Sequence, residues 1–119
     1  MPSAAILTED VFFLAKIKEV ADSLAIATEF KSSGYDIVDY CKKNRPELII
    51  LDMNAQGAFD AIRNLKKDSE LFGVPIVGYL LHTQVQQKMK AKELGCDFVL
   101  ARSDFSKNLP AILKGEYWK

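Results

Sequence analysis

The sequence has no excess of charge of either sign. Its 119 residues include 16 Lys and Arg and 16 Asp and Glu, so the formal net charge is zero. Proteins that bind nucleic acid through the phosphate backbone usually concentrate Lys and Arg on one surface. We therefore expect no direct contact with nucleic acid.

Cysteine and histidine are scarce. Cys41 and Cys96 are far apart in the sequence and match no spacing of a metal site. Each lies in an apolar context, so we expect free, buried thiols, as in a protein of a reducing compartment. The only histidine, His82, has no Cys or Ser partner at a recognisable spacing. We expect a solvated loop histidine and no independent enzyme, since no nucleophile–base pair is present.

Long apolar runs are also missing. No stretch is long enough to cross a bilayer, and Met1-Pro2-Ser3 lacks the basic and apolar regions of a signal peptide. We expect a soluble protein of the cytoplasm that has no membrane partner. The short apolar run at residues 4–8 is followed by Glu9 and Asp10 instead of a Gly-rich phosphate loop, which disfavours a binder of flavin or of another small molecule.

Short apolar runs alternate with amphipathic runs of helical periodicity. The expected strands span residues 4–8, 25–30, 47–52, 74–81 and 98–101. The helices between and after them number five, the last three at residues 58–67, 83–94 and 104–114. Strict alternation predicts right-handed crossovers, a parallel sheet and helices on both faces. We expect an α/β fold with strand order 2-1-3-4-5, which places the polar second strand at an edge.

The chain is expected to form one domain over residues 1–119, with a core over about 4–114. Residues 115–119 form a tail that either frays or docks through Tyr117 and Trp118. Pro110 lies within the last helical pattern and predicts a kink or a late helix start. The expected apolar faces consist of Tyr35, Val38 and Cys41 in the second helix and of Val85, Met89 and Leu94 in the fourth.

Carboxylates follow two of the expected strands. The run Leu48-Ile49-Ile50-Leu51 ends in Asp52, and the first strand is followed by Glu9 and Asp10. The carboxyl ends of parallel strands share one edge of a sheet, so these acids are expected to meet in one crevice. Such a set could hold Mg²⁺, with the backbone carbonyl of Asn54 as a further ligand.

A purely structural interpretation competes with the metal site. Glu9 and Asp10 precede a helix, where acidic side chains cap free N–H groups and favour the helix dipole. Asp52 can be a helix cap in the same way. Without a metal, three clustered acids repel one another, and the pKa of one of them rises. The sequence leaves both interpretations open.

The order of these features resembles the receiver domain of bacterial response regulators, which has a flavodoxin-like fold. Glu9-Asp10 stands where receivers keep an acidic pair, and Asp52 stands where they keep the phosphoaccepting aspartate. Three further segments are similar to receiver sequences, at residues 42–52, 73–77 and 93–97. The resemblance implies a flavodoxin-like sheet with five helices, Mg²⁺ in the acidic crevice and phosphorylation of Asp52.

The sequence also departs from the receiver pattern. The loop between Asp52 and Gly57 is short and contains neither Pro nor a further Asp. The Ser/Thr position of the fourth strand falls on Leu80, and the aromatic switch position falls on Val99. The Lys-Pro position of the fifth strand falls on Arg102-Ser103. Arg102 is therefore a candidate phosphate ligand, or a structural counter-ion of Asp52.

Two hypotheses follow from the resemblance. The first is a single-domain response regulator, a monomer or weak dimer, phosphorylated on Asp52 by a sensor histidine kinase or a phosphotransfer protein. Its downstream protein would bind the face made by helix 83–94, strand 98–101 and helix 104–114. The alternative is a pseudo-receiver that binds a protein partner constitutively, without phosphorylation.

The substitutions at two switch positions predict poor signal transmission. Leu80 has no hydroxyl to bind a phosphate, and Val99 has no aromatic ring to move. A phosphate on Asp52 should therefore change the downstream face little, unless the loop at residues 52–57 has been remodelled to carry the signal.

Overall fold

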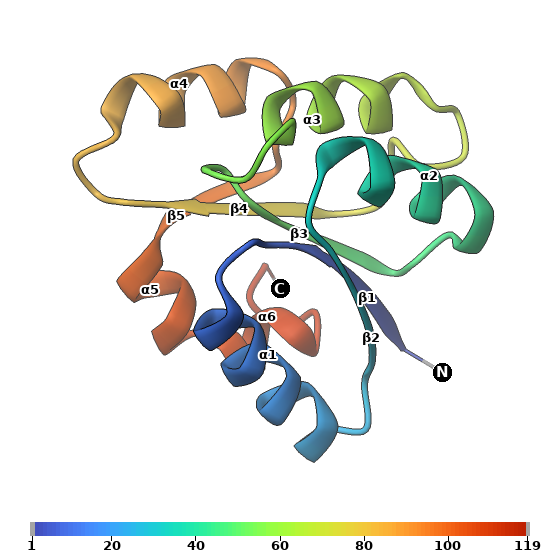
Figure 1. Ribbon diagram of the computed structural model, residues 1–119, viewed down its shortest axis with the longest axis vertical. Helices are drawn as coiled ribbons and strands as arrows, with labels where there is room; N and C mark the ends of the chain where they lie inside the picture. Colours follow the sequence, from blue (N-terminus) through green and yellow to red (C-terminus); the bar gives the residue numbers. More distant parts are fainter. Residues whose placement is uncertain (1, 119) are drawn as a thin grey trace.

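The computed structural model describes residues 2–118. Within them a five-stranded parallel sheet has the order β2-β1-β3-β4-β5 (Figure 1). The strands are β1 (Ser3–Leu7), β2 (Ala27–Lys31), β3 (Leu48–Asp52), β4 (Ile76–Leu80) and β5 (Phe98–Ala101). The predicted strand order is confirmed, and the polar strand β2 lies at an edge, where one side needs no strand partner.

Helices cover both faces of the sheet. On one face lie α1 (Val11–Ser23), α5 (Arg102–Lys107) and α6 (Leu109–Leu113), and on the other lie α2 (Gly34–Asn44), α3 (Ala58–Lys67) and α4 (Val85–Glu93) (Figure 1). Side chains alternate between the two faces along each strand, so the sheet separates two apolar cores. Ile6 and Ile50 pack toward α1, whereas Leu7 and Leu51 pack toward α2 and α3. This explains why the interior residues of the central strands are apolar on both faces.

Residues 2–118 contain six helices, so the prediction of five helices was wrong. The expected helix 104–114 is divided at Asn108 into α5, which already begins at Arg102, and α6. In a continuous helix Pro110 would leave the carbonyl of Ser106 without its donor. In the first turn of α6 its missing N–H is not needed.

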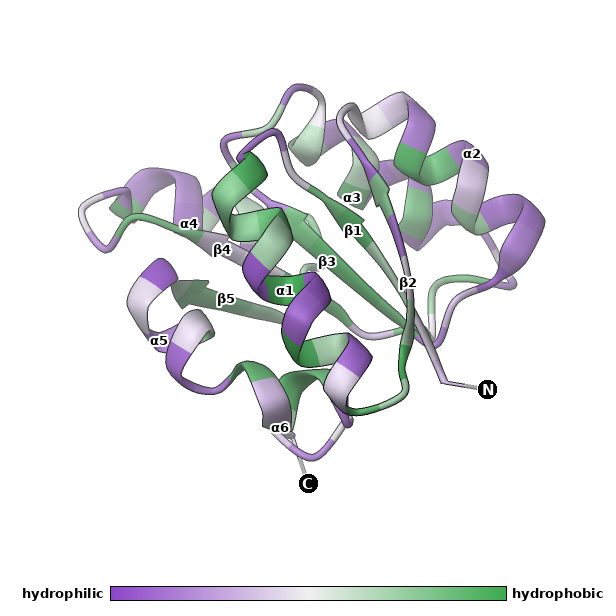
Figure 2. Cartoon of the chain, turned by 60° about the horizontal axis from the view of Figure 1, so that its bottom comes forward, coloured by the Kyte–Doolittle hydropathy of each residue, from purple (hydrophilic) through white to green (hydrophobic). Residues whose placement is uncertain are grey.

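Two predicted apolar faces are partly wrong. In α2, Val38 and Cys41 are buried as predicted, but Tyr35 is 81% exposed and Ile37 is buried in its place. The fourth helix begins at Val85 and not at residue 83, and within Val85–Glu93 only Ala91 is buried. Figure 2 shows most of α4 in the hydrophilic colour, in contrast to the central strands. A small buried side chain holds α4 to the body only lightly, which matters for the site described below.

The end of the chain packs against the sheet. The ring of Trp118 stacks on Phe98 at 5.4 Å between centroids, and Tyr117 meets the same ring edge-on at 5.9 Å. Docking of these two side chains is thus the alternative that the structure adopts. Met1 and Lys119 lie outside the described residues, so the predicted 115–119 tail is described only through Trp118.

Both cysteines are free and buried, as predicted. Burial raises the pKa of the Cys41 thiol to about 12 and that of Cys96 to about 11, so both are protonated at neutral pH. Among residues 2–118 no helix combines the length and the hydrophobicity that crossing a bilayer requires.

Candidate functional site

The carboxyl ends of the central strands bring the predicted acids to one edge of the sheet. β1 pairs with β3 in parallel, with Leu7 opposite Leu51, so Glu9 and Asp10 follow β1 on the side where Asp52 ends β3. Burial raises the pKa of the Asp52 carboxyl, and the charges of Asp10 and Glu9 raise it further. Arg102 and the Asn54 N–H act in the opposite direction. These groups therefore share one electrostatic environment.

Asp10 is the N-cap of α1. Its Oδ1 accepts hydrogen bonds from the N–H groups of Phe12 at 3.0 Å and Phe13 at 3.1 Å. Its Oδ2 pairs with the guanidinium of Arg102. The Arg102 hydrogen bond is the main reason why the pKa of Asp10 lies below its usual range. The helix-cap interpretation therefore applies to Asp10.

Asp52 and Glu9 have other roles. Helix α3 is capped by Gly57, so Asp52 is not a helix cap. Asp52 is half-buried, and its Oδ1 accepts a hydrogen bond from the N–H of Asn54 at 2.9 Å. Glu9 Oε2 accepts one from the N–H of Gln56 at 3.2 Å. Both acids thus hold the loop that joins β3 to α3.

Arg102 neutralises Asp10 and not Asp52. It starts α5 directly after β5, and its guanidinium carbon lies 4.4 Å from the centre of the Phe13 ring, within cation–π range. The guanidinium is therefore held by a carboxylate and by an aromatic face. Its charge still reaches Asp52, whose pKa it lowers.

The donor set suits Mg²⁺ chemically, but its arrangement does not form a ready metal centre. Carboxylate and carbonyl oxygens are the ligands that Mg²⁺ prefers. Within residues 2–118, however, no three Asp, Glu, His or Cys side chains are grouped closely enough to hold a metal ion. Both oxygens of Asp10 are engaged, one of them by Arg102. A cation at the predicted site would have to compete with that guanidinium.

A buried tyrosine, which the sequence analysis did not single out, forms the floor of the crevice. Tyr79 lies opposite Asp52 in the sheet register, and its ring centroid is 4.8 Å from that of Phe13 and 4.7 Å from that of Phe105. Its hydroxyl lies 3.2 Å from the Thr8 hydroxyl, to which it donates a hydrogen bond. The sequence offered one indication of this role, a tyrosine in a strand whose other residues are nonpolar.

Leu80 and Val99 pack on the other side of the sheet. Their exposures are 2% and 5%, and both belong to the core beneath α2, α3 and α4. The receiver positions for a hydroxyl and an aromatic ring are therefore filled here by buried aliphatic side chains.

The loops after β3 and β4 are joined by two side-chain amides. Asn54 and Gln84 exchange a pair of hydrogen bonds of 2.9 and 2.8 Å, each donating to the other. The two residues are 30 positions apart in loop segments. No periodicity in the sequence marks such a contact.

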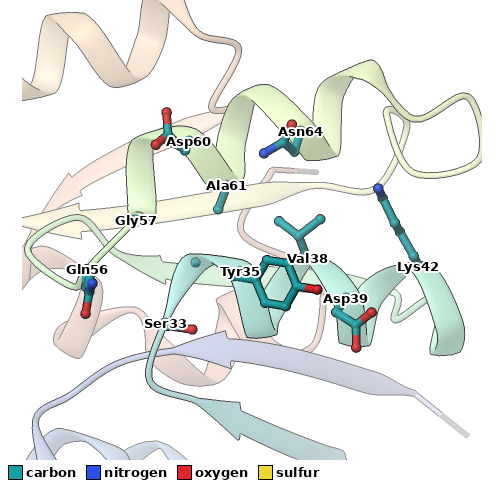
Figure 3. A pocket seen from close by; sticks show the side chains of 11 residues that line it. Ser33, Tyr35, Val38, Asp39, Lys42, Gln56, Gly57, Asp60, Ala61 and Asn64 are labelled. Carbon is teal, nitrogen blue, oxygen red and sulfur yellow. The ribbon is translucent and has the colours of Figure 1, made fainter.

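A surface cavity of about 600 Å³ lies between α2 and α3 (Figure 3). It borders the same loop, because Gln56 and Gly57 are part of its wall. Its charged lining residues are of both signs and comprise Asp39, Asp60 and Lys42. The cavity therefore shows no preference for a ligand of one charge.

No family model matches the sequence, and no curated protein matches it. Among solved structures, the chain is similar to the chemotaxis response regulator CheY4 of Vibrio cholerae. The identity is 18% and the TM-score 0.84, over 98% of each chain. The fold is that of a receiver domain.

Two further receiver structures have the same fold. The receiver domain of the Pseudomonas aeruginosa sensor histidine kinase PA1611 is 15% identical, with a TM-score of 0.79 over 95% of this chain and 98% of that one. That structure holds a magnesium ion in the active site cleft. The phosphorylated cyanobacterial phytochrome response regulator RcpA is 18% identical, with a TM-score of 0.82 over 96% of this chain and 89% of the other. At such identities the likeness establishes the receiver fold and not the chemistry of the crevice.

Proposed function

We propose that this chain is a single-domain receiver of a cytoplasmic two-component phosphorelay, in which Asp52 accepts a phosphoryl group. The position and burial of Asp52 carry this proposal. It ends the central strand β3 at the carboxyl edge of the sheet, half-buried, with its Oδ1 held by the Asn54 N–H. Among the described hydrogen bonds no donor engages its second oxygen, which favours a nucleophilic role.

The proposed step transfers phosphorus from a donor to the carboxylate. A carboxylate oxygen of Asp52 attacks the phosphorus of a phosphohistidine on a sensor kinase or phosphotransfer protein. The new O–P bond forms as the donor's N–P bond breaks, and the electron pair leaves on the imidazole. Small acyl phosphates can replace the protein donor, with a carboxylate as the leaving group.

Two further groups complete the proposed crevice. Glu9, Asp10, Asp52 and the carbonyl of Asn54 would hold Mg²⁺ weakly, and the bound ion would supply positive charge against the phosphoryl oxygens. Arg102 contributes a second positive charge at the same edge. Its planar guanidinium can donate two hydrogen bonds to a phosphate once it leaves Asp10.

The alternative is a pseudo-receiver that binds its partner constitutively. The observation that favours it is the burial of Leu80 and Val99, which provide no hydroxyl or aromatic ring to report a phosphate. In either case the proposed partner surface is the face of α4, β5 and α5. There Val85 and Met89 are 60% and 58% exposed.

Labelling with acetyl phosphate and Mg²⁺ tests the proposal directly. We expect one phosphoryl group per chain in the wild type and none in Asp52→Asn, measured by intact mass. Only the ionised carboxylate is nucleophilic, and burial raises the pKa of Asp52 in the folded chain. Without Mg²⁺, the Asp52 carboxyl should therefore take up its proton at a higher pH than an ordinary aspartate, whose pKa is about 3.9, as its side-chain carbon signal would report.

The exposed Asp22→Asn is the matched control, because Asp22 pairs with Lys18 on α1 and lies outside the crevice. It should label like the wild type. An unlabelled wild type would leave the pseudo-receiver as the function, and equal labelling of Asp52→Asn would place the phosphoacceptor elsewhere.

Metal affinity should increase when Arg102 is removed. In Arg102→Ala the carboxylate of Asp10 loses its bound guanidinium, and a repulsive charge beside the cation disappears. We expect Mg²⁺ to bind about three- to tenfold more tightly, a modest change because the ion pair is partly exposed. Titration of the amide signals of residues 9, 10 and 52 measures the affinity.

Lys107→Ala removes the same charge from an exposed position of the same helix. It should leave the Mg²⁺ affinity nearly unchanged. Equal gains in both variants would show that the effect is one of overall charge and not of competition for Asp10.

A further inference from the structure

The side chains of Asn54 and Gln84 connect the loop after Asp52, the proposed phosphoacceptor, to the start of α4. Asn54 Nδ2 donates to Gln84 Oε1 at 2.9 Å, and Gln84 Nε2 donates to Asn54 Oδ1 at 2.8 Å. Gln84 Oε1 accepts a second hydrogen bond, from the N–H of Leu81 at 2.9 Å. We call the Asn54–Gln84 pair the amide latch.

On one side the latch is attached to the crevice. The Asn54 N–H donates to Asp52 Oδ1, while the Asn54 side chain holds Gln84. Asn54 is therefore fixed at its backbone by the acid and at its side chain by the latch. A change in the hydrogen bonding of Asp52 cannot reorient Asn54 without affecting both contacts.

On the other side the latch holds a weakly anchored helix end. Gln84 is the N-cap residue of α4, yet its side chain does not cap the helix, because it is engaged with Asn54 and Leu81. Within Val85–Glu93 only Ala91 is buried. A helix end with few buried contacts opens locally at a low free-energy cost. The latch therefore contributes much of the stability that keeps the start of α4 folded.

We infer that the amide latch couples the state of Asp52 to the start of α4. This inference rests on the proposed function, in which Asp52 becomes phosphorylated. Once the unengaged oxygen of Asp52 carries a phosphoryl group, Oδ1 becomes a neutral acyl oxygen and a weaker acceptor than a carboxylate oxygen, whereas the charged phosphoryl oxygens are stronger acceptors. The Asn54 N–H then moves to a phosphoryl oxygen, its side chain leaves Gln84, and the bond to Leu81 loosens with it.

This route avoids the two switch positions that are aliphatic in this chain. It runs through the loop at residues 52–57 and across to residues 81–84, along the rim of the crevice, and needs no movement of Leu80 or Val99. It ends where Leu81, Val85 and Met89 are 52%, 60% and 58% exposed. The latch consists of hydrogen bonds between exposed, neutral side-chain amides. Each of these bonds is weak, so a new charge nearby is sufficient to break them.

Amide hydrogen exchange with and without beryllofluoride and Mg²⁺ tests the latch. In the wild type we expect the Leu81 and Lys88 amides to exchange about tenfold faster when the phosphate mimic is bound, because the start of α4 is released. In Asn54→Ala the same amides should already exchange fast without the mimic. Asn54 is a hydrogen-bond partner of neither amide, so a local loss of contact does not account for this change.

The variants Gln84→Ala and Asn54→Ala/Gln84→Ala complete the cycle, and Gln87→Ala is the matched control on the exposed side of α4. The double variant should exchange no faster at Lys88 than Gln84→Ala alone, because Gln84→Ala already removes both hydrogen bonds of the latch. Gln87→Ala should keep the wild-type response to beryllofluoride.

The amide of Asp52 reports binding of the mimic separately. A shift at Asp52 together with an unchanged α4 response in Asn54→Ala would overturn the latch alone. No shift at Asp52 in the wild type would overturn the proposed function and, with it, the coupling. A shift at Asp52 with the α4 response lost only in the latch variants supports both.

Discussion

Tyr79→Ala should lower the free energy of unfolding by about 4 kcal/mol, as is typical for a large buried aromatic side chain. Tyr79 is 1% exposed and packs against the rings of Phe13 and Phe105. Its removal leaves a void directly beneath the acidic crevice and takes a hydrogen-bond partner from Thr8. Urea denaturation at neutral pH, followed by circular dichroism, measures the change.

Tyr79→Phe separates packing from hydrogen bonding. The ring stays in place and only the hydrogen bond to Thr8 is lost, so we expect a cost of about 1 kcal/mol. The Thr8 hydroxyl still accepts the N–H of Asp10 in this variant. If the two substitutions cost the same, the aromatic cluster contributes far less than its burial indicates.

Gly34→Ala should be the most damaging change that adds a single methyl group. A Cβ at position 34 would lie 2.1 Å from the carbonyl oxygen of Gly57 and 2.6 Å from its carbonyl carbon. Both atoms belong to backbone that cannot rotate away, so α2 and the loop after β3 must separate. We expect a loss of about 3 kcal/mol in unfolding free energy, at the upper end of overpacking effects.

The same substitution should disturb the crevice. The Gly34 N–H donates to the carbonyl of Gln56 at 2.8 Å, and the Gln56 N–H donates to Glu9. Separation of α2 from the loop after β3 therefore moves Gln56 and, with it, the side chain of Glu9. We expect labelling of Asp52 by acetyl phosphate to be slower in this variant than in the wild type.

Gly73→Ala is the matched control for Gly34→Ala. Nothing lies within 4 Å of a Cβ at position 73, so its effect should stay within about 0.5 kcal/mol. Helix propensity alone predicts the reverse order, because Ala is favoured over Gly in a helix such as α2 and not in a turn. Equal stability of the two variants would contradict the close contact between Gly34 and Gly57.

The sequence by itself determined the architecture and the place of the acids. Strict alternation of apolar and amphipathic runs requires a parallel sheet with crossovers, and the polar residues of β2 place that strand at an edge. Parallel strands end at a common edge, so Glu9, Asp10 and Asp52 had to lie on the same side of the molecule. These features follow from the periodicity of apolar residues along the chain, which shows whether each segment forms a helix or a strand.

Only the tertiary structure decided which groups those acids contact. Arg102 pairs with Asp10 across 92 positions, and Asn54 pairs with Gln84 across 30. The Tyr79 hydroxyl meets Thr8 across 71 positions. Such partners depend on strand register, on how far each loop extends and on the rotation of helices against the sheet. A side chain's choice among several nearby donors is settled by distances that no periodic pattern encodes.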